Sequence, residues 1–209
     1  MKKIWYAPNK FESYGEEEIQ AVVECLRSGW LAGFGPRSVE FEEKIAKRFG
    51  KKYGVFVNSG SSACLLALAA LNLRKGAKVI TPACTFSTTL APIIQLGYKS
   101  IFIDVDLTSY VPTVADIIAA IDDEVEAIMV PNLIGNKPDW AGLRAELQRI
   151  GRTDIYVIED SADTVTYTEE SDVSTTSFYA SHVITAGGIG GMVMFNDKKQ
   201  VERALQYRD

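Results

Sequence analysis

The chain has 209 residues, of which 47% are hydrophobic and 23% charged, and its formal net charge is −5. This length supports one domain with a sizeable core, and the composition is that of a globular protein. The acidic balance and the lack of a basic block argue against nucleic acid as a partner. The three cysteines show no close paired spacing. They predict neither a zinc site nor a disulfide framework, and they fit a reduced, cytoplasmic setting.

The hydropathy pattern of the sequence does not indicate a membrane protein. Residues 1–5 lead directly into polar sequence, which predicts that no signal peptide is present. The longest apolar stretch, at 63–73, is too short and too mixed to span a bilayer. We therefore expect no membrane partner.

Helical and strand patterns alternate along the chain. Helices are predicted at residues 16–28, 39–49, 63–73, 87–96, 113–121, 139–150 and 198–207. Short strands are predicted at residues 55–58, 78–81, 100–105, 127–131, 154–158, 177–179 and 192–195. Repeated strand–helix units predict a three-layer α/β fold, with a mostly parallel seven-stranded sheet covered on both faces. Ligands of such sheets gather at the carboxyl ends of the strands.

The segment Asn-Ser-Gly-Ser-Ser-Ala at 58–63 follows a predicted strand and opens a predicted helix. Backbone N–H groups at a helix start, together with the hydroxyls of Ser61 and Ser62, can form a phosphate cradle. Gly60 would let the backbone approach the anion closely. The same residues also suit an ordinary serine N-cap, so the segment alone leaves both interpretations open.

Residues at two further strand ends could contact a cofactor ring that contains a nitrogen. Phe86, at the mouth of a strand, could stack on a cofactor ring or pack in the core. The carboxylates of Glu159, Asp160 and Asp163 follow another strand. One of them could pair with a protonated pyridine nitrogen or cap the next turn. A metal site is not predicted, because no histidine lies nearby in sequence and the acids lack the spacing of a calcium loop.

His182 is the only histidine of the chain and lies in a loop rich in Thr and Ser. It comes five residues after Ser177, a possible second phosphate ligand, and just before the glycine-rich segment 187–191. A lone histidine is usually structural. An imidazole can nevertheless transfer protons near neutral pH, which makes His182 a candidate catalytic residue.

The order of these motifs resembles the DegT/DnrJ/EryC1/StrS family of sugar aminotransferases, which are fold-type I pyridoxal-phosphate proteins. The quoted motifs are Gly-Ser-Ser-Ala at 60–63, Thr-Pro-Ala-Cys-Thr-Phe at 81–86, Asp-Val-Asp at 104–106, Glu-Asp at 159–160 and Ser-Phe-Tyr at 177–179. The resemblance runs from residues 14–18 to 207–209 and is specific as a set. It implies that residues 1–209 form an N-terminal segment and the large, cofactor-binding domain of an aspartate aminotransferase-like fold. The small C-terminal domain of the family is expected to be absent from this chain.

The resemblance implies a role for each matching residue. Gly60, Ser61, Ser62 and Ser177 would hold the phosphate, and Phe86 would stack on the pyridine ring. The ring nitrogen would pair with Asp160. Asp163 would complete the cofactor-binding set.

His182 falls where most members of the family carry the lysine that bonds covalently to the cofactor. Imidazole has no primary amine, so pyridoxal 5′-phosphate (PLP) or pyridoxamine 5′-phosphate (PMP) would be held non-covalently. Histidine at this position is similar to the branch of nucleotide-linked 4-keto-6-deoxyhexose 3-dehydratases. Asp163, the segment 134–136 and the terminal Arg-Asp at 208–209 also resemble that branch. The segment 188–191 departs from the family's Glu-Gly-Gly by what looks like one extra residue.

We therefore expect a PLP/PMP-dependent 3-dehydratase of deoxysugar and surface polysaccharide biosynthesis, with His182 as the group that transfers protons. The implied partners are a nucleotide-sugar substrate, a second copy in a homodimer, and either glutamate as amine donor or a reductase. An iron–sulfur cluster would be possible only in a part that this chain lacks.

Two alternatives stay open. One is a sugar aminotransferase, although no lysine lies between Lys137 and Lys198 to replace His182. The other is a non-catalytic relative that binds the cofactor or a sugar nucleotide, which the irregular glycine loop and the short chain favour.

Overall fold

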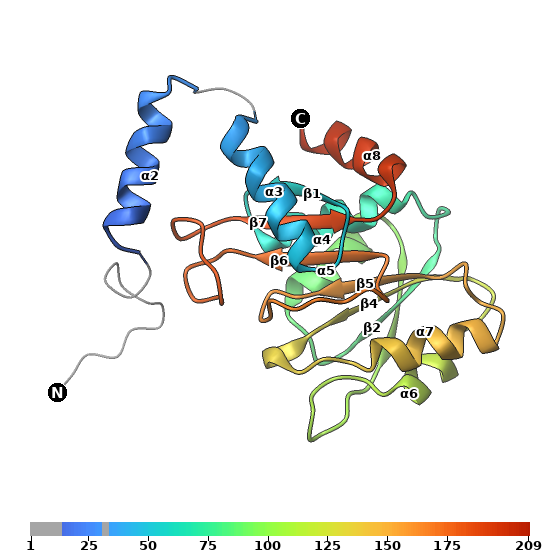
Figure 1. Cartoon of the computed structure of the whole chain (residues 1–209). Coiled ribbons are helices and arrows are strands. Elements are labelled where there is room, and N and C mark those ends of the chain that lie inside the picture. Colours follow the sequence, from blue (N-terminus) through green and yellow to red (C-terminus); the bar gives the residue numbers. More distant parts are fainter. Residues whose placement is uncertain (1–13, 31–33) are drawn as a thin grey trace.

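The computed structural model describes residues 14–30 and 34–209, so the predicted absence of a signal peptide at residues 1–5 lies outside the described ranges. Seven strands form one sheet with helices on both faces (Figure 1). The strand order is β1-β7-β6-β5-β4-β2-β3. The predicted three-layer α/β fold with a mostly parallel seven-stranded sheet is confirmed.

The sheet is parallel except around one strand. Its strands are β1 (Tyr53–Val57), β2 (Lys78–Pro82), β3 (Lys99–Ile103), β4 (Val125–Pro131), β5 (Tyr156–Asp160), β6 (Val173–Ser177) and β7 (Gly191–Phe195). β7 runs antiparallel to both of its neighbours, β1 and β6. The other pairings, β2 with β3 and with β4, β4 with β5 and β5 with β6, are all parallel. The carboxyl ends of β4, β5 and β6 therefore meet at one edge, where ligands of parallel sheets bind.

Four of the described helices begin at residues whose side chains cap them. The helices are α2 (Glu16–Arg27), α3 (Pro36–Arg48), α4 (Gly60–Leu71), α5 (Ser87–Gln95), α6 (Val114–Ala119), α7 (Trp140–Arg149) and α8 (Lys198–Arg208), with a short 3₁₀ turn, η1 (Leu133–Gly135). The side chains of Ser59, Thr113, Asp139 and Asp197 each accept a hydrogen bond from a backbone N–H in the first turn that follows. Such caps satisfy donors that have no partner within the helix.

The two faces of the sheet bury separate apolar layers. On one face, helices α4, α5 and α8 pack on inward-facing strand residues such as Val193 and Phe195. On the other face, α6 and α7 cover β2, β4 and β5, while Ile45 and Phe49 at the end of α3 pack near Phe178. Helix α4 is buried almost all round, which explains why its sequence is rich in Ala and Leu and lacks a polar face.

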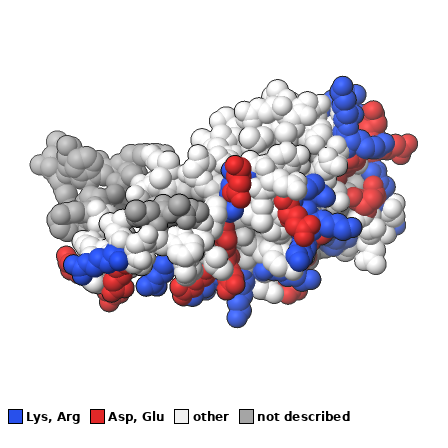
Figure 2. All heavy atoms as spheres, turned by 90° about the horizontal axis from the view of Figure 1, so that it is seen from above, with Lys and Arg blue, Asp and Glu red and all other residues white. Residues whose placement is uncertain are grey.

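The surface carries both signs of charge. On the face seen in Figure 2, Lys and Arg side chains lie among Asp and Glu, and no area of a single sign dominates that view. Ion pairs such as Lys44–Glu40 and Lys78–Glu124, each at 2.7 Å, contribute to this mixture. In the described ranges, no helix combines the length and the apolar character needed to cross a bilayer.

The predicted strand at 177–179 is wrong, because β6 covers Val173–Ser177 and Ser177 ends it. After its first residue β6 is Ser-Thr-Thr-Ser, so it lacks the apolar run by which strands were recognised, although the whole strand is buried. The hydroxyls of Ser174, Thr175 and Thr176 are instead satisfied by acceptors on and beside β5. The strand predicted at 154–158 is likewise displaced, since β5 extends through Asp160 and includes both carboxylates.

Burial on the α4 side predicts that substitutions of two phenylalanines in strands will change the free energy of unfolding by different amounts. Phe195 is fully buried, whereas Phe102 in β3 is 54% exposed. Phe195→Ala should lower the free energy of unfolding by about 3–5 kcal/mol, because it removes buried surface and leaves a cavity. Phe102→Ala, the matched control, should change it by about 0.5 kcal/mol. Urea denaturation followed by circular dichroism measures both, and equal losses would contradict the assigned core.

Candidate functional site

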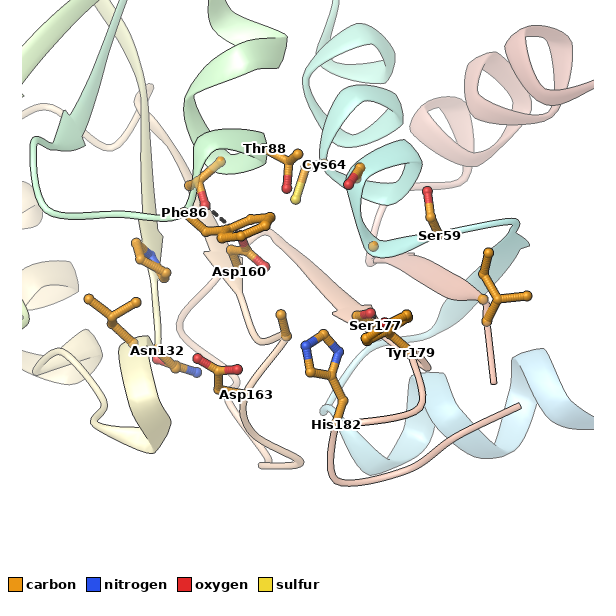
Figure 3. A pocket seen from close by; sticks show the side chains of 18 residues that line it. Ser59, Cys64, Phe86, Thr88, Asn132, Asp160, Asp163, Ser177, Tyr179 and His182 are labelled. Carbon is orange, nitrogen blue, oxygen red and sulfur yellow. Dashed lines mark hydrogen bonds between the residues drawn. The ribbon is translucent and has the colours of Figure 1, made fainter. Parts of the chain in front are cut away.

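A cavity of about 440 Å³ lies at the carboxyl-end edge of the sheet (Figure 3). Its walls come from the starts of α4 and α5, the ends of β4, β5 and β6, and the loop 178–190. The predicted site residues that line it are Gly60, Ser61, Phe86, Asp160, Asp163, Ser177 and His182. The fold thus brings together residues that are separated by more than a hundred positions in the sequence.

An anion cradle is formed where α4 begins beside the end of β6. The Ser59 hydroxyl accepts a hydrogen bond from the Ser62 N–H at 3.1 Å. The N–H groups of Gly60 and Ser61 have no protein acceptor within the described part of the chain. A Cβ added at Gly60 would lie 2.7 Å from the Ser177 Cβ, so only glycine permits this approach. Two free N–H groups at a helix start, with the Ser177 hydroxyl opposite, suit a phosphate group.

Ser62 lies outside this cavity, in contrast to its neighbours in the cradle. Its hydroxyl accepts a hydrogen bond from the Ser59 hydroxyl at 3.1 Å, and its side chain lines a separate groove beside Tyr98 and Arg208. Successive residues of a helix point about 100° apart, so Ser61 and Ser62 cannot both face the cavity. The motif fits a serine N-cap and an anion cradle at once, with Ser59 as the cap.

The glycine-rich loop is a continuation of the β6–β7 pairing. Phe178 N–H donates to Gly190 O at 2.8 Å, and Ala180 N–H donates to Gly188 O at 3.0 Å. Gly188 and Gly190 have φ values of +107° and +145°, a region that favours glycine. Between them Ile189 is 64% exposed and lines the cavity. The segment 188–191 thus gives the cavity an apolar wall residue that sequence analysis did not identify.

Gly191 is required for a different reason. A Cβ added there would lie 2.2 Å from the backbone carbon of Ser59, the residue that caps α4. The first residue of β7 therefore supports the anion cradle from behind through direct backbone contact. The glycine cluster in the sequence was the signal for this contact, but its partner is 132 positions away in the chain and no local pattern identifies it.

The two carboxylates at the end of β5 have different surroundings, because side chains alternate along a strand. Glu159 is fully buried on one face. It accepts hydrogen bonds from Asn132 Nδ2 at 2.6 Å, Ser174 Oγ at 2.9 Å, Thr168 Oγ1 at 3.0 Å and Ser171 Oγ at 3.3 Å. This network joins β4, β5, β6 and the 161–172 connection. Glu159 therefore holds the wall of the site together and does not line it.

Asp160 points to the other face, toward α4 and α5, and lines the cavity. Its Oδ2 accepts a hydrogen bond from Thr89 Oγ1 at 2.8 Å and its Oδ1 one from Thr175 Oγ1 at 3.2 Å. Burial raises the pKa of the Asp160 carboxyl above its ordinary value, and hydrogen bonds from neighbouring side chains offset part of that rise. A buried carboxylate of this kind favours a cationic ligand group.

Phe86 and Asp163 form the outer part of the site. Phe86 precedes α5 and is 67% exposed, which excludes the alternative that it packs in the core. In Figure 3 its ring lies over the Asp160 carboxylate. Asp163 Oδ2 accepts a hydrogen bond from the Ile134 N–H at 3.0 Å, and Ile134 has a φ of +55°. Asp163 thus fixes the turn after β4 as well as lining the cavity.

His182 lies on the opposite wall, on the β6–β7 loop. Its imidazole meets the Tyr179 ring edge-on, with centroids 5.9 Å apart, and the backbone N–H of His182 donates to Tyr179 O at 2.9 Å. Its Nδ1 atom is buried and has no hydrogen-bond partner among the described residues. Figure 3 shows the ring turned toward the space between Asp163 and Ser177. Buried polar atoms without a partner are rare in folded proteins, so this nitrogen distinguishes His182 from a fully hydrogen-bonded structural histidine.

Several lining residues were not predicted from the sequence. They are Cys64, Thr89, Asn132, Tyr179 and Ile189. In the described ranges, His, Cys, Asp and Glu side chains form no group of three or more that could hold a metal ion.

This combination of an α/β sheet, an anion cradle at a helix start, an exposed aromatic ring and a buried carboxylate defines a site for a flat ligand that carries an anion and a cation. The model of the DegT/DnrJ/EryC1/StrS aminotransferase family matches residues 12–209, and the chain belongs to that family.

Individual relatives include enzymes of two kinds. The chain is 37% identical to dTDP-4-dehydro-2,6-dideoxy-D-glucose 3-dehydratase of Saccharopolyspora spinosa, over 86% of this chain and 41% of that protein. It is 33% identical to GDP-perosamine synthase of Escherichia coli O157:H7, over 97% of this chain and 57% of that protein. A crystal structure of NtdA from Bacillus subtilis with bound PMP matches with a TM-score of 0.86 at 24% identity, over 99% of this chain and 48% of that one. The last likeness shows the fold. The chain spans about half the length of these relatives.

The raised pKa of Asp160 predicts how Asp160→Asn changes stability. Because the folded-state pKa lies above the unfolded value, the charged carboxylate destabilises the fold at neutral pH. The ligand-free Asn variant should therefore unfold at a higher urea concentration than the parent at neutral pH. This gain should shrink as the pH falls and vanish below about 3, where the parent carboxyl is protonated in both states.

Asp163→Asn provides the matched control, because the Asp163 side chain is exposed. It should give no comparable gain at any pH. A loss of stability in Asp160→Asn at neutral pH would contradict the assigned cost of burying this charge.

Proposed function

We propose that this chain binds PMP or PLP without a covalent bond and forms the cofactor domain of a 3-dehydratase acting on a nucleotide-linked 4-keto-6-deoxyhexose. The observation that supports it is the position of His182 in a cavity: among the described residues its Nδ1 has no hydrogen-bond partner, and no lysine lines the cavity. The 37% identity to a relative named as a sugar 3-dehydratase supports the same choice.

The residues present fit a pyridoxal cofactor. The cradle of Gly60, Ser61 and Ser177 would hold the phosphate, and Phe86 would cover one face of the ring. Asp160 would pair with the ring nitrogen and favour its protonated form. When bound, the protonated ring of such a cofactor supplies an electron sink. The close approach at Gly60 and the unpaired N–H groups are the structural features that fit a phosphate.

His182 would serve as the proton carrier of the reaction. Its imidazole contacts the Tyr179 ring, and its Nδ1 has no hydrogen-bond partner among the described residues. An imidazole near neutral pH can take a proton from carbon and return it to a departing hydroxyl. Because histidine forms no covalent bond of the lysine type, the phosphate and ring contacts alone would retain the cofactor.

The proposed reaction sets the partners. The substrate would be a nucleotide sugar with a C4 ketone, and loss of its C3 hydroxyl would lead to a 3-deoxy sugar. Glutamate as amine donor, or a reductase, would renew the amine form of the cofactor. We further propose a homodimer as the working form.

A sugar aminotransferase is the second candidate, and the relation to GDP-perosamine synthase favours it. It requires an amine that reaches the cofactor from a lysine. No lysine lines the cavity among the described residues, and none lies between Lys137 and Lys198 in the sequence. The product distinguishes the two, because transamination leaves an amino group at C4 and dehydration leaves no oxygen at C3.

The first test is turnover by the full-length gene product with PMP and a GDP- or dTDP-linked 4-keto-6-deoxyhexose. Mass spectrometry should detect a 3-deoxy product. His182→Asn should lower the rate at least ~100-fold, the usual contribution of a general base, and leave PMP affinity within about threefold. Undiminished turnover in the variant would contradict the role of His182, and a 4-amino product from the parent would support transamination.

The second test is His182→Lys, which places a primary amine on the same loop. If His182 occupies the site of the family's lysine, this variant should attach PLP covalently. Treatment with borohydride should then make the bond permanent, and peptide mass spectrometry should locate it at position 182. The parent protein, treated identically, should release all its PLP on denaturation. Equal retention of cofactor by both proteins would contradict the assigned position.

A further inference from the structure

The carboxylate of Asp160 is surrounded by neutral hydrogen-bond donors from three separate elements. Thr89 from α5 contacts Oδ2 at 2.8 Å, and Thr175 from β6 contacts Oδ1 at 3.2 Å. Cys64 from α4 lies beside both groups: its Sγ is 3.5 Å from Thr175 Oγ1, and its thiol is also a hydrogen-bond partner of Asp160. Thr89 and Thr175 are fully buried and Cys64 is 2% exposed, so the fold holds these donors in place.

The number of hydrogens determines which way these bonds run. A threonine hydroxyl has one hydrogen and two lone pairs. When Thr175 donates its hydrogen to Asp160, its remaining lone pairs face Cys64, which can donate its S–H. Burial raises the pKa of the Cys64 thiol well above its ordinary value, so the thiol keeps this hydrogen. The Cys64 thiol is thus a donor that supports Asp160, either directly or through Thr175.

This arrangement suits the ionised form of Asp160 better than the protonated form. With one donor on each oxygen, both oxygens act as acceptors, as in a carboxylate. A protonated carboxyl would have to donate from one oxygen, which would turn one of the two threonines round. If Thr175 turned, its hydrogen would meet the Cys64 sulfur, which is a weak acceptor. The three side chains therefore favour the charge that burial alone disfavours.

We propose that Thr89, Thr175 and Cys64 are positioning residues that keep the Asp160 carboxylate charged and oriented for the ring nitrogen of the cofactor. This inference rests on the proposed binding of a pyridoxal cofactor, and it is independent of whether the reaction is dehydration or transamination. Each residue acts through Asp160, so its loss changes the charge of Asp160 and leaves the phosphate cradle intact.

PMP binding as a function of pH tests the proposal without any turnover. Isothermal titration from about pH 4 to 8 should show that affinity falls on the acid side, as Asp160 takes up a proton. In Thr89→Val and Thr175→Val, this fall should occur about one pH unit higher, because each variant removes a hydrogen bond to a charged group. Thr89→Ser should restore the parent profile. Cys64→Ala should shift it less, and Cys64→Ser should not shift it.

Thr176→Val is the matched control for Thr175→Val. Thr176 is the next residue of β6 and is also buried, but its hydroxyl donates to Ser161 O at 2.9 Å and does not contact Asp160. It should lower stability without moving the pH profile. Circular dichroism checks that every variant is folded, and the serine variants provide the test if a valine variant is not.

A PMP analogue with carbon in place of the ring nitrogen separates positioning from general structural support. The parent should bind PMP more tightly than the analogue. Thr89→Val and Thr175→Val should reduce this preference about tenfold at a pH just above the one at which the parent begins to lose affinity for PMP. Equal weakening for both ligands, or an unshifted pH profile in folded variants, would overturn the proposal. If the parent binds neither ligand, the cofactor assignment itself fails. If it binds both equally, the pairing of Asp160 with the ring nitrogen fails.

Discussion

The burial of two adjacent carboxylates at the end of β5 is the constraint around which this site is built. Glu159 and Asp160 cannot share a set of donors, because alternation along the strand directs them to opposite faces. Each face must therefore supply its own hydrogen bonds. Glu159 receives four from neutral side chains, which ties the β4 end and the 161–172 connection to the sheet. Asp160 receives fewer and keeps one side open to the cavity. One carboxylate is satisfied by the fold, and the other awaits a ligand.

The polar character of β6 follows from this constraint. A strand of Ser and Thr at the centre of a sheet is unusual, but Ser174 and Thr175 face Glu159 and Asp160 respectively, as the parallel register requires. This is why sequence analysis missed the strand. A search for apolar runs recognises strands that bury hydrocarbon, whereas β6 buries hydroxyls whose partners lie in another strand. The apolar strands β2, β4 and β7, and the helices with local caps, could be predicted because their signals lie within a few residues.

The sequence likewise predicted some of the site residues and missed others. Gly60, Ser61 and Ser177 were found from a motif at a helix start and from its resemblance to a family, and they converge in space. Ser62 shows where a motif is not enough, since the helix turns its side chain into another groove. Thr89 and Cys64 carry no sequence signal, because a threonine and a cysteine in apolar helices have no evident role until the fold places an acid beside them. The contact of Gly191 with Ser59 could not be predicted for the same reason, because its two residues come together only in the folded chain.

The site also shows why function and stability oppose each other in this chain. Burial of Asp160 raises its pKa, so a charged Asp160 without a cationic partner weakens the fold. A protein selected for stability alone would carry a neutral or apolar residue there. The donors on Asp160 reduce this cost, and a protonated ring nitrogen would remove most of the rest. The free Nδ1 of His182 is a second polar group left without a protein partner in the same cavity. A ligand that carries a cation beside Asp160 and a polar group beside His182 would relieve both costs at once, which is why the same two groups that weaken the ligand-free fold favour binding.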